Sequence, residues 1–293
     1  MRIAVIGSIN IDMSIEAAHI PLKGETVFGK NIQYIPGGKG ANQAVAIAKL
    51  GGDVAMFGCV GDDNHGEEMI RNLRKYNIET KYIKKEKDVS TGLALITVGD
   101  HDNTIVVVKG ANDCVDKFYI DEHKDVLKEF DMIVLQYEIP YDTVEYIIDW
   151  CYEEGKTVIF NPAPAASVPV KLIERSTYVT PNEHEVLAIF NHQYTLEELL
   201  KMYPEKLIVT LGSQGVAVCL KDGQVHNIPA RLVEVVDTTG AGDTVNGAFA
   251  YGLSIGKNIK DALWYANCAA SLSIQKYGAQ GGMPTNEEVE SIL

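Results

Sequence analysis

The chain has 293 residues, 46% of them hydrophobic, and a formal net charge of −14. This length and composition predict a globular protein with a substantial buried core, built as one large α/β domain with an elaboration or as two modest domains. The acidic balance argues against nucleic acid or an anionic membrane surface as the main partner, because both require a basic binding surface.

The N-terminal segment and the cysteines indicate the cellular setting. The apolar run in MRIAVIGSINIDMS is too short for a secretory signal, and no stretch of 18 apolar residues occurs. We therefore expect a cytoplasmic protein that does not span a membrane. The cysteines are scattered, odd in number and without a CxxC pair, which indicates buried or incidental thiols rather than disulfides or a zinc site: Cys59, Cys114, Cys151, Cys219 and Cys268.

Short β-branched runs alternate with helical segments along the chain. The strand RIAVIG precedes a helix over 40–50, and the strand VAMFGCVG precedes a helix over 65–76. The runs DMIVLQ, TVIFNP, YVTPN and KLIVTLG are nearly continuous in apolar residues, as in strands covered on both faces, and a helix is predicted over 143–153. Further helices begin at Gly242 and Ile259. This alternation predicts a three-layer α/β/α fold with a doubly wound, mostly parallel sheet.

Two segments interrupt this alternation. Residues 13–34 and 91–108 have the pattern of strands and hairpins without crossover helices, and the second turns at the polar sequence GDHDN. They predict a small antiparallel β lid outside the main sheet. The remaining stretches, 1–12, 35–90 and 109–293, would form one α/β domain that binds the ligands.

Polar residues follow the ends of most predicted strands. Ligands of doubly wound folds bind outside the carboxyl ends of the strands, so these positions predict a binding site. The residues concerned are those of SIN-ID after the first strand, then Glu138, Asn161, Asn182, Glu185, Thr210, Leu211 and Gly212.

Two motifs near the N-terminus favour ligand binding. In GGKGANQAVA, Lys39 and Asn42 place polar groups at the open end of a helix, although a loop that needs glycine dihedrals before a tightly packed helix is the alternative. Asn10 and Asp12 lie two apart in an extended segment, so both point to one side and could bind a pair of hydroxyls. An Asx turn is the alternative there.

The sequence DTTGAGDTVNGAFA, residues 237–250, has a helical apolar spacing that places Asp243 in a first helical turn. Free N–H groups at such a helix start can hold an anion. Capping alone would also account for Asp243. Asn182 and Glu185 could similarly form only a helix cap, Asp237 could cap its own turn, and Glu138 could be a solvated loop acid.

The motifs SIN-ID, GGKGANQAVA, NPAPA, PNE, TLGSQG and DTTGAGDTVNGAFA resemble the ribokinase-like (PfkB-type) carbohydrate kinases, in the family's order and over residues 3–284. The resemblance implies phosphorylation of D-ribose at the 5-hydroxyl by ATP, with Mg²⁺ and a K⁺-like monovalent cation. Alternatives are a kinase of this fold for deoxyribose, another sugar or a nucleoside, or a sugar or nucleotide sensor without catalysis. The intact Asp243, Asn182 and Glu185 argue against the sensor.

The resemblance also implies a role for each matching residue. Asp243 would accept the proton of the sugar's primary hydroxyl, beside an anion hole of free N–H groups in the turn formed by Gly240, Ala241, Gly242 and Asp243. The sugar-binding positions, besides Asp243, are Asn10, Asp12, Gly38, Lys39, Asn42 and Glu138, with the lid residues Ala94, Ile96 and Val107 on the apolar side of the pocket.

The nucleotide and cation positions are implied in the same way. Asn182 and Glu185 match the element that organises Mg²⁺, largely through water. The nucleotide positions are Asn182, Thr210, Gly212, Gly215, Gly242 and Asn267, and the K⁺-like site would use Asp237, Thr239, Ser273, Lys276 and Gly278.

Three further expectations accompany the resemblance. Val245 stands where the family usually has Phe, on the buried face of the helix, which leaves the chemistry unchanged. Gly282 stands where Ser is usual, which predicts weaker binding of the monovalent cation. Exposed apolar faces of the lid strands favour a homodimer formed through the lid, as in this family.

Overall fold

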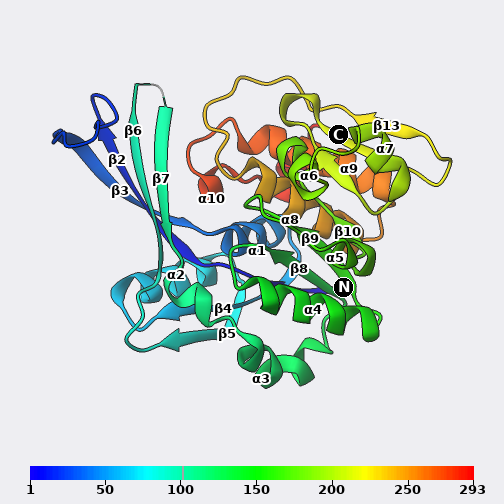
Figure 1. Ribbon diagram of the computed structural model, residues 1–293, viewed down its shortest axis with the longest axis horizontal. Helices are drawn as coiled ribbons and strands as arrows, with labels where there is room; N and C mark the ends of the chain where they lie inside the picture. The colour runs from blue at the N-terminus through cyan, green and yellow to red at the C-terminus, as the bar shows by residue number, and fades with distance from the viewer. Residues whose placement is uncertain (101) are drawn as a thin grey trace.

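The computed structural model describes residues 1–100 and 102–293, and its centre is a six-stranded sheet of order β10-β9-β8-β1-β4-β5 (Figure 1). Every neighbouring pair in it is parallel. The chain begins at a central strand and adds strands first on one side and then on the other, which is the doubly wound arrangement. The strands are β1 (Arg2–Ile6), β4 (Asp53–Gly61), β5 (Glu79–Glu86), β8 (Met132–Gln136), β9 (Thr157–Asn161) and β10 (Tyr178–Val179).

Both faces of this sheet are covered by helices. Successive side chains of a strand point to opposite faces, so Ile3 and Val5 of β1 enter one hydrophobic core while Ala4 and Ile6 enter the other. The first core contains residues of α1 (Lys39–Lys49), α2 (Asn64–Lys75), α8 (Ala241–Ser254) and α9 (Ile259–Ser273). The second contains residues of α3 (Lys117–Leu127), α4 (Tyr141–Glu153), α5 (Val170–Arg175), α6 (Glu183–Ile189) and α7 (Leu196–Met202). The predicted three-layer fold is confirmed.

The segment KLIVTLG forms a strand outside the parallel sheet. It supplies β11 (Ile208–Thr210), which pairs antiparallel with β12 (Val216–Cys219), and β12 pairs with β13 (Val225–Ile228). The chain reverses directly after β11 through the short turn η2 (Gly212–Gln214), so no crossover helix places the next strand parallel. Two isolated parallel bridges, Val179–Leu207 and Asn182–Thr210, still join β11 to the end of β10.

A four-stranded sheet of order β3-β2-β6-β7 extends from one side of this body (Figure 1). Its strands are β2 (Asn10–Ala17), β3 (Gly29–Gly37), β6 (Gly92–Gly99) and β7 (Asp102–Val108). The outer pairs are antiparallel, whereas β2 and β6 are parallel, so the prediction of an antiparallel lid is wrong for the central pair. Both strands leave the carboxyl edge of the main sheet, β2 after β1 and β6 after β5, and therefore run in one direction.

The predicted lid segments, 13–34 and 91–108, contribute to these four strands, and the division of the chain into lid and α/β domain stays a prediction. The expected turn GDHDN includes His101, which lies outside the described residues. Within the described ranges, no helix has both the length and the hydrophobicity that crossing a bilayer requires. The cysteines are free thiols, four of them buried, as predicted.

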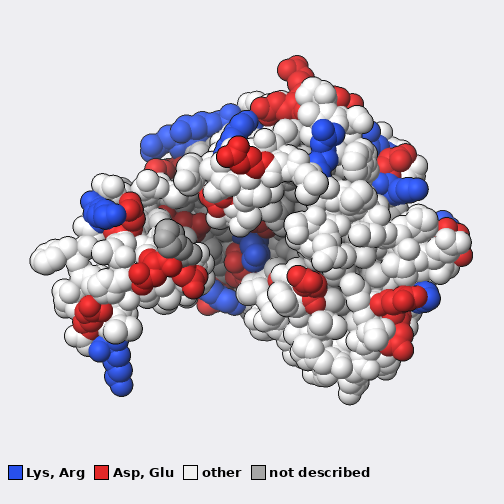
Figure 2. Space-filling model, turned by 90° about the horizontal axis from the view of Figure 1, so that it is seen from above, with Lys and Arg blue, Asp and Glu red and all other residues white. Residues whose placement is uncertain are grey.

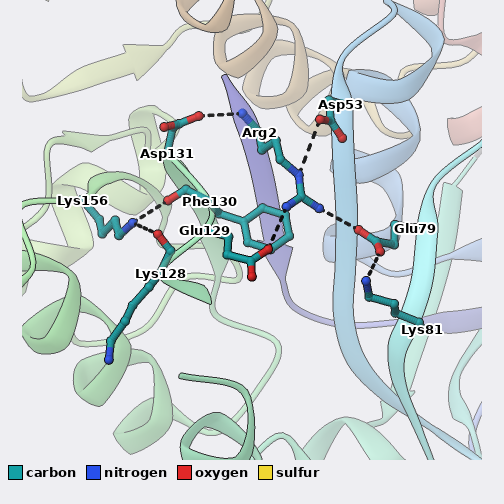
Figure 3. A network of polar contacts seen from close by, with 9 residues as sticks. All are labelled: Arg2, Asp53, Glu79, Lys81, Lys128, Glu129, Phe130, Asp131 and Lys156. Atoms are coloured by element: carbon teal, nitrogen blue, oxygen red, sulfur yellow. Dashed lines mark hydrogen bonds and ion pairs between the residues drawn. The ribbon is translucent and has the colours of Figure 1, made fainter. Parts of the chain in front are cut away.

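Arg2 lies at the amino edge of the sheet, among three carboxylates and the ring of Phe130 (Figure 3). Its Nη2 lies 2.9 Å from Glu79 Oε2, its Nη1 lies 3.3 Å from Glu129 Oε2, and its Nε lies 3.5 Å from Asp53 Oδ2. The guanidinium carbon lies 4.4 Å from the centre of the Phe130 ring. One side chain therefore connects the starts of β4 and β5 with the loop that precedes β8.

We expect Arg2→Ala to lower the free energy of unfolding by about 1–2 kcal/mol, because several partly exposed ion pairs and one cation–π contact are lost together. Urea unfolding measures this change. Lys81→Ala, which removes an outer ion pair to Glu79 and an exposed contact with the Tyr82 ring, is the control and should change stability much less. A variant Arg2→Ala with unchanged stability would contradict this role.

Candidate active site

The turn before α8 places Asp243 at the carboxyl edge of the sheet. Gly240 has a φ of 76°, a left-handed conformation that side chains disfavour, and a Cβ there would lie 2.6 Å from the Cβ of Ala279. The helix therefore begins at Ala241, and Asp243 lies buried in its first turn.

Both oxygens of the Asp243 carboxylate accept hydrogen bonds from side chains near the start of α1. The Asn42 Nδ2 donates to Oδ2 at 2.9 Å, and the Gln43 Nε2 donates to Oδ1 at 3.1 Å. Burial raises the pKa of Asp243, while the Lys39 ammonium and the two amides oppose that rise. An oriented, ionisable carboxylate of this kind is suited to accept a proton.

Gln43 was not predicted from the sequence. Its Oε1 accepts from Gln136 Nε2 at 2.8 Å, and its Nε2 also lies 3.3 Å from Asn161 Oδ1. Because an ionised carboxylate only accepts hydrogen bonds, Gln43 must turn its amino group toward Asp243 and its oxygen toward Gln136. The available signal was a glutamine among the small residues of GGKGANQAVA, on the helix face that packs inward.

Two free amides remain at the start of α8. The Ala241 N–H donates to the Thr238 carbonyl at 3.1 Å, because the turn closes on itself, so the prediction that this group is free is wrong. Among the described residues, the N–H groups of Gly242 and Asp243 have no acceptor. A Cβ on Gly242 would meet nothing within 4 Å, so the space beside these amides is open to an anion.

A cavity lies beside these amides. It is lined by Lys39, Asn161, Ala163, Thr180, Asn182, Glu185, Thr210, Thr238, Gly240, Ala241, Gly242, Asp243 and Asn246. Burial disfavours the Lys39 ammonium, but Asp243, Glu138 and Glu185 together raise its pKa above the usual value. Figure 2 shows acidic and basic side chains inside the hollow between the lid and the body. The site therefore combines one buried cation with several carboxylates.

Five predicted sugar-binding residues share one face of the lid. Asp12 pairs with Ala94, and Ala94 pairs with Val107, while Asn10 and Ile96 lie two residues away along their strands. Burial, with Glu138 and Asp243 nearby, raises the pKa of Asp12 to about 6. The structure thus brings the acidic end of the lid close to Asp243.

Glu138 connects two elements instead of being a solvated loop acid. Its Oε2 accepts from Ser8 Oγ at 2.5 Å and from the backbone N–H of Lys39 at 3.0 Å. Gly38 precedes this contact with a φ of 88°, and a Cβ there would lie 2.7 Å from the Asn10 nitrogen. Ser8 was missed as a partner, although it begins the motif SIN-ID.

Asn112, also missed, fixes the start of the lid. Its Nδ2 donates to Asn10 Oδ1 at 2.7 Å, and its Oδ1 accepts from the Ile9 N–H at 2.8 Å. It lies in η1 (Gly110–Cys114), directly after β7. No local pattern in the sequence relates it to Asn10.

Asn182 and Glu185 form the helix cap that was the simple alternative. The Asn182 Oδ1 accepts from the N–H groups of His184 and Glu185, and the Glu185 Oε2 accepts from the Asn182 N–H at 2.8 Å. Glu185 nevertheless lines the cavity, and burial raises its pKa. Within the described chain, no three His, Cys, Asp or Glu side chains gather around a metal-sized space. A cation at Glu185 would therefore need ligands from phosphate and water.

The other nucleotide positions fall into two groups. Thr210 lines the cavity beside Asn182, and Gly212 and Gly215 lie in the turn that follows β11. Asn267 has a different environment, because its Nδ2 donates to the Ile228 carbonyl at 2.7 Å in a buried position. Asn267 therefore fixes the backbone after β13.

The structure brings together the two segments predicted to hold a monovalent cation. The Asp237 Oδ1 accepts from the Thr239 N–H and Oδ2 accepts from the Gly278 N–H, both at 2.9 Å. A Cβ on Gly282 would lie 2.3 Å from the Ser273 carbonyl oxygen and 3.4 Å from that of Lys276. These carbonyls therefore approach one point, and this backbone has no room for the family's usual serine. Val245 is buried, as predicted.

The family model described as pfkB family carbohydrate kinase matches residues 1–286. The chain belongs to this family. Among curated members of the pfkB family, the ribokinases of Bacillus subtilis and Lactococcus lactis are 46% and 45% identical to it over 292 and 294 residues, covering all of this chain and 99% and 97% of theirs.

Solved pfkB kinase structures agree with the fold. The ribokinase of Thermotoga maritima superposes with a TM-score of 0.91 at 36% identity, covering 99% of this chain and 98% of that one. The ribokinase of Arabidopsis thaliana, complexed with ribose and ATP, gives a TM-score of 0.91 at 30% identity, covering 99% and 97%. This chain is accordingly a carbohydrate kinase of the pfkB family.

We expect this pfkB kinase to bind D-ribose more weakly in acid. With a pKa of about 6, Asp12 is mostly ionised at about pH 7.5 and mostly protonated at about pH 5. Its loss as a hydrogen-bond acceptor should weaken affinity roughly 10-fold across this range. Calorimetry without nucleotide measures the change, with Asp12→Asn as the pH-insensitive control. An affinity that is constant over this range would rule out the role.

Proposed function

We propose that this kinase transfers the γ-phosphoryl group of ATP to the 5-hydroxyl of D-ribose, giving D-ribose 5-phosphate and ADP. The observation that carries the proposal is the buried Asp243 carboxylate, oriented by Asn42 and Gln43 beside the free amides of Gly242 and Asp243. The full-length relatives named ribokinase support ribose as the sugar.

Asp243 accepts the proton of the 5-hydroxyl while that oxygen attacks the γ-phosphorus. The bond between the γ-phosphorus and the β–γ bridging oxygen breaks, and ADP leaves with the electron pair. The amides of Gly242 and Asp243 stabilise the charge on the transferring group, and the Lys39 ammonium, which lines the same cavity, offsets the charge of the phosphates. Gly240 allows the turn that directs these amides into the cavity.

The sugar lies between the lid and the carboxyl edge of the sheet. Asp12 and Asn10 bind its secondary hydroxyls, with Glu138, Gly38 and the backbone of Lys39 on the opposite side. Asn42 donates one amide hydrogen to Asp243, and its second hydrogen remains available for the sugar. Ala94, Ile96 and Val107 form the apolar wall of the pocket, on the same lid face as Asp12.

ATP occupies the cavity beside Glu185 and the turn after β11. The solved Arabidopsis thaliana ribokinase contains ATP, and that of Cryptococcus neoformans contains ADP, which supports a nucleotide at this edge. Asn182 and Glu185 would hold Mg²⁺ through water, and the ion would supply positive charge against the phosphates. Thr210, Gly212, Gly215 and Asn267 shape the nucleotide side.

The residues that would hold a K⁺-like ion are Asp237, Thr239, Ser273, Lys276 and Gly278. Burial alone would raise the pKa of Asp237, but the Thr239 side chain and the backbone N–H groups of Thr239 and Gly278 lower it, so the carboxylate stays charged for a cation. Gly282 offers no side-chain ligand where relatives have a serine, so we expect this chain to bind the ion more weakly than those relatives do.

The homodimer and the cytoplasmic location are further proposals. On the lid face opposite the proposed sugar wall, Leu95, Val106 and Val108 are exposed, Val106 by more than half. A second lid would cover such a surface.

Deoxyribose is the second candidate substrate, because the deoxyribokinase of Salmonella typhi is 35% identical over 303 residues. That identity is lower than the 46% of the Bacillus subtilis ribokinase. Nucleoside kinases with solved structures are 24% and 23% identical, so they support the fold alone. A sensor without catalysis would not need the oriented Asp243.

We expect kcat/KM for D-ribose to exceed that for 2-deoxyribose by roughly 10²-fold, because a buried Asp12 that loses its hydroxyl partner stays unpaired. ADP release over ribose, deoxyribose, fructose and nucleosides at saturating MgATP measures this. In Asp12→Ala, the kcat/KM values for D-ribose and 2-deoxyribose should differ by a smaller factor. Equal kcat/KM values in the unmodified enzyme would refute the assignment, and a preference for deoxyribose would favour the second candidate.

A further inference from the structure

The segment around α10 (Ala279–Gly282) contacts three parts of the proposed machinery with three consecutive residues. The Gly278 N–H donates to Asp237 at 2.9 Å, which joins it to the cation loop, residues 273–278. Ala279 packs against Gly240, where no Cβ would fit, at the turn before the free amides. Gln280 donates from Nε2 to the Asn42 Oδ1 at 3.0 Å. A movement of this segment would therefore reach all three places.

Gln280 is buried, and its two ends have different partners. Its Oε1 accepts from the Asn72 Nδ2 of α2 at 2.7 Å, and its backbone carbonyl accepts from the Lys49 ammonium at 3.4 Å. Because Asn72 donates to its oxygen, Gln280 presents its amino group to Asn42. Asn42 accepts with its oxygen and thus presents its own amino group to Asp243 at 2.9 Å.

The hydrogen bonds from Asn72 through Gln280 and Asn42 to Asp243 can run in only one donor-to-acceptor direction. The ionised Asp243 accepts but cannot donate, so a flipped Asn42 amide would place an oxygen against a carboxylate oxygen in a buried site. Gln280 adds a second constraint against that flip, because its amino group donates to the Asn42 oxygen in the observed orientation. This second constraint on Asn42 holds while α10 stays in position.

We propose that Gln280 is a positioning residue that couples the cation loop to the Asp243 carboxylate through Asn42. The inference rests on the proposed function, because it takes Asp237 as part of a monovalent-cation site and Asp243 as the base. A bound cation orders residues 273–278, the ordered loop holds α10, and α10 holds the amide that orients Asn42. Cation binding then changes turnover without contact between the ion and either substrate.

The test compares Gln280→Met, which keeps the length of the side chain but removes its hydrogen bonds, with Gln224→Met. Gln224 is an exposed glutamine in the turn between β12 and β13, outside the sugar, nucleotide and cation positions. Turnover at saturating ribose and MgATP is measured in K⁺ and in tetramethylammonium at equal ionic strength. The thermal midpoint is measured in the same salts without substrates, which reports cation binding independently of turnover.

In the unmodified enzyme and in Gln224→Met, K⁺ should raise both the thermal midpoint and kcat. Gln280→Met should keep the K⁺-induced rise in midpoint, lose most of the K⁺ activation, and show a kcat in K⁺ that is roughly 10-fold lower. A purely structural role of Gln280 would not produce this combination of intact cation binding and lost activation.

The coupling is overturned if Gln280→Met keeps the full K⁺ activation, or if it also loses the midpoint rise, since Gln280 would then act on ion binding itself. If K⁺ has no effect on the unmodified enzyme, the cation site and the coupling are both refuted. If only the coupling is wrong, the unmodified enzyme is still activated by K⁺. If Gln280→Met does not fold, Asn72→Ala takes its place. It should lose part of the activation, and an unchanged activation ratio there would refute the proposal.

Discussion

A buried carboxylate needs hydrogen-bond donors and a compensating charge, and the rest of this structure depends on meeting that requirement at Asp243. Both donors and the ammonium of Lys39 come from the start of α1. The side-chain amides of Asn42 and Gln43 in α1 can reach Asp243 in α8 only because the two helices pack closely. Gly247 of α8 makes this approach possible, since a Cβ there would lie 2.5 Å from the Cβ of Ala46 in α1. The small residues on these helices therefore serve the chemistry as well as the packing.

The parallel sheet separates the stabilising contacts from the reactive ones. At the amino edge, Arg2 connects the starts of the strands through ion pairs and the ring of Phe130. At the carboxyl edge, the loops after β1 and β8 bring Ser8 and Glu138 to one site, together with Asn161 at the end of β9. The lid strands β2 and β6 begin at the same edge, so Asp12 at that end of the lid lies near Asp243.

Sequence reasoning succeeded where the signal was local. The apolar spacing after Asp243 and the glycines before it predicted the start of α8, and near-continuous apolar runs predicted the parallel strands. It failed where partners lie far apart in the chain. Gln43 and Gln280 meet Asp243 and Asn42 across 200 and 238 residues, and no spacing within a segment records such a contact. The parallel pairing of β2 with β6 likewise follows from where two distant strands leave the sheet.

The most direct test of the account is turnover in Asp243→Asn, measured by ADP release at saturating ribose and ATP, together with calorimetric affinities for both ligands. Asparagine keeps the size of the side chain but cannot accept the hydroxyl proton. The account predicts a kcat lower by roughly 10² to 10⁴-fold with affinities within about threefold of the unmodified enzyme. A variant that folds normally and keeps a near-normal kcat would contradict it and would leave Asp243 with a helix-capping role alone.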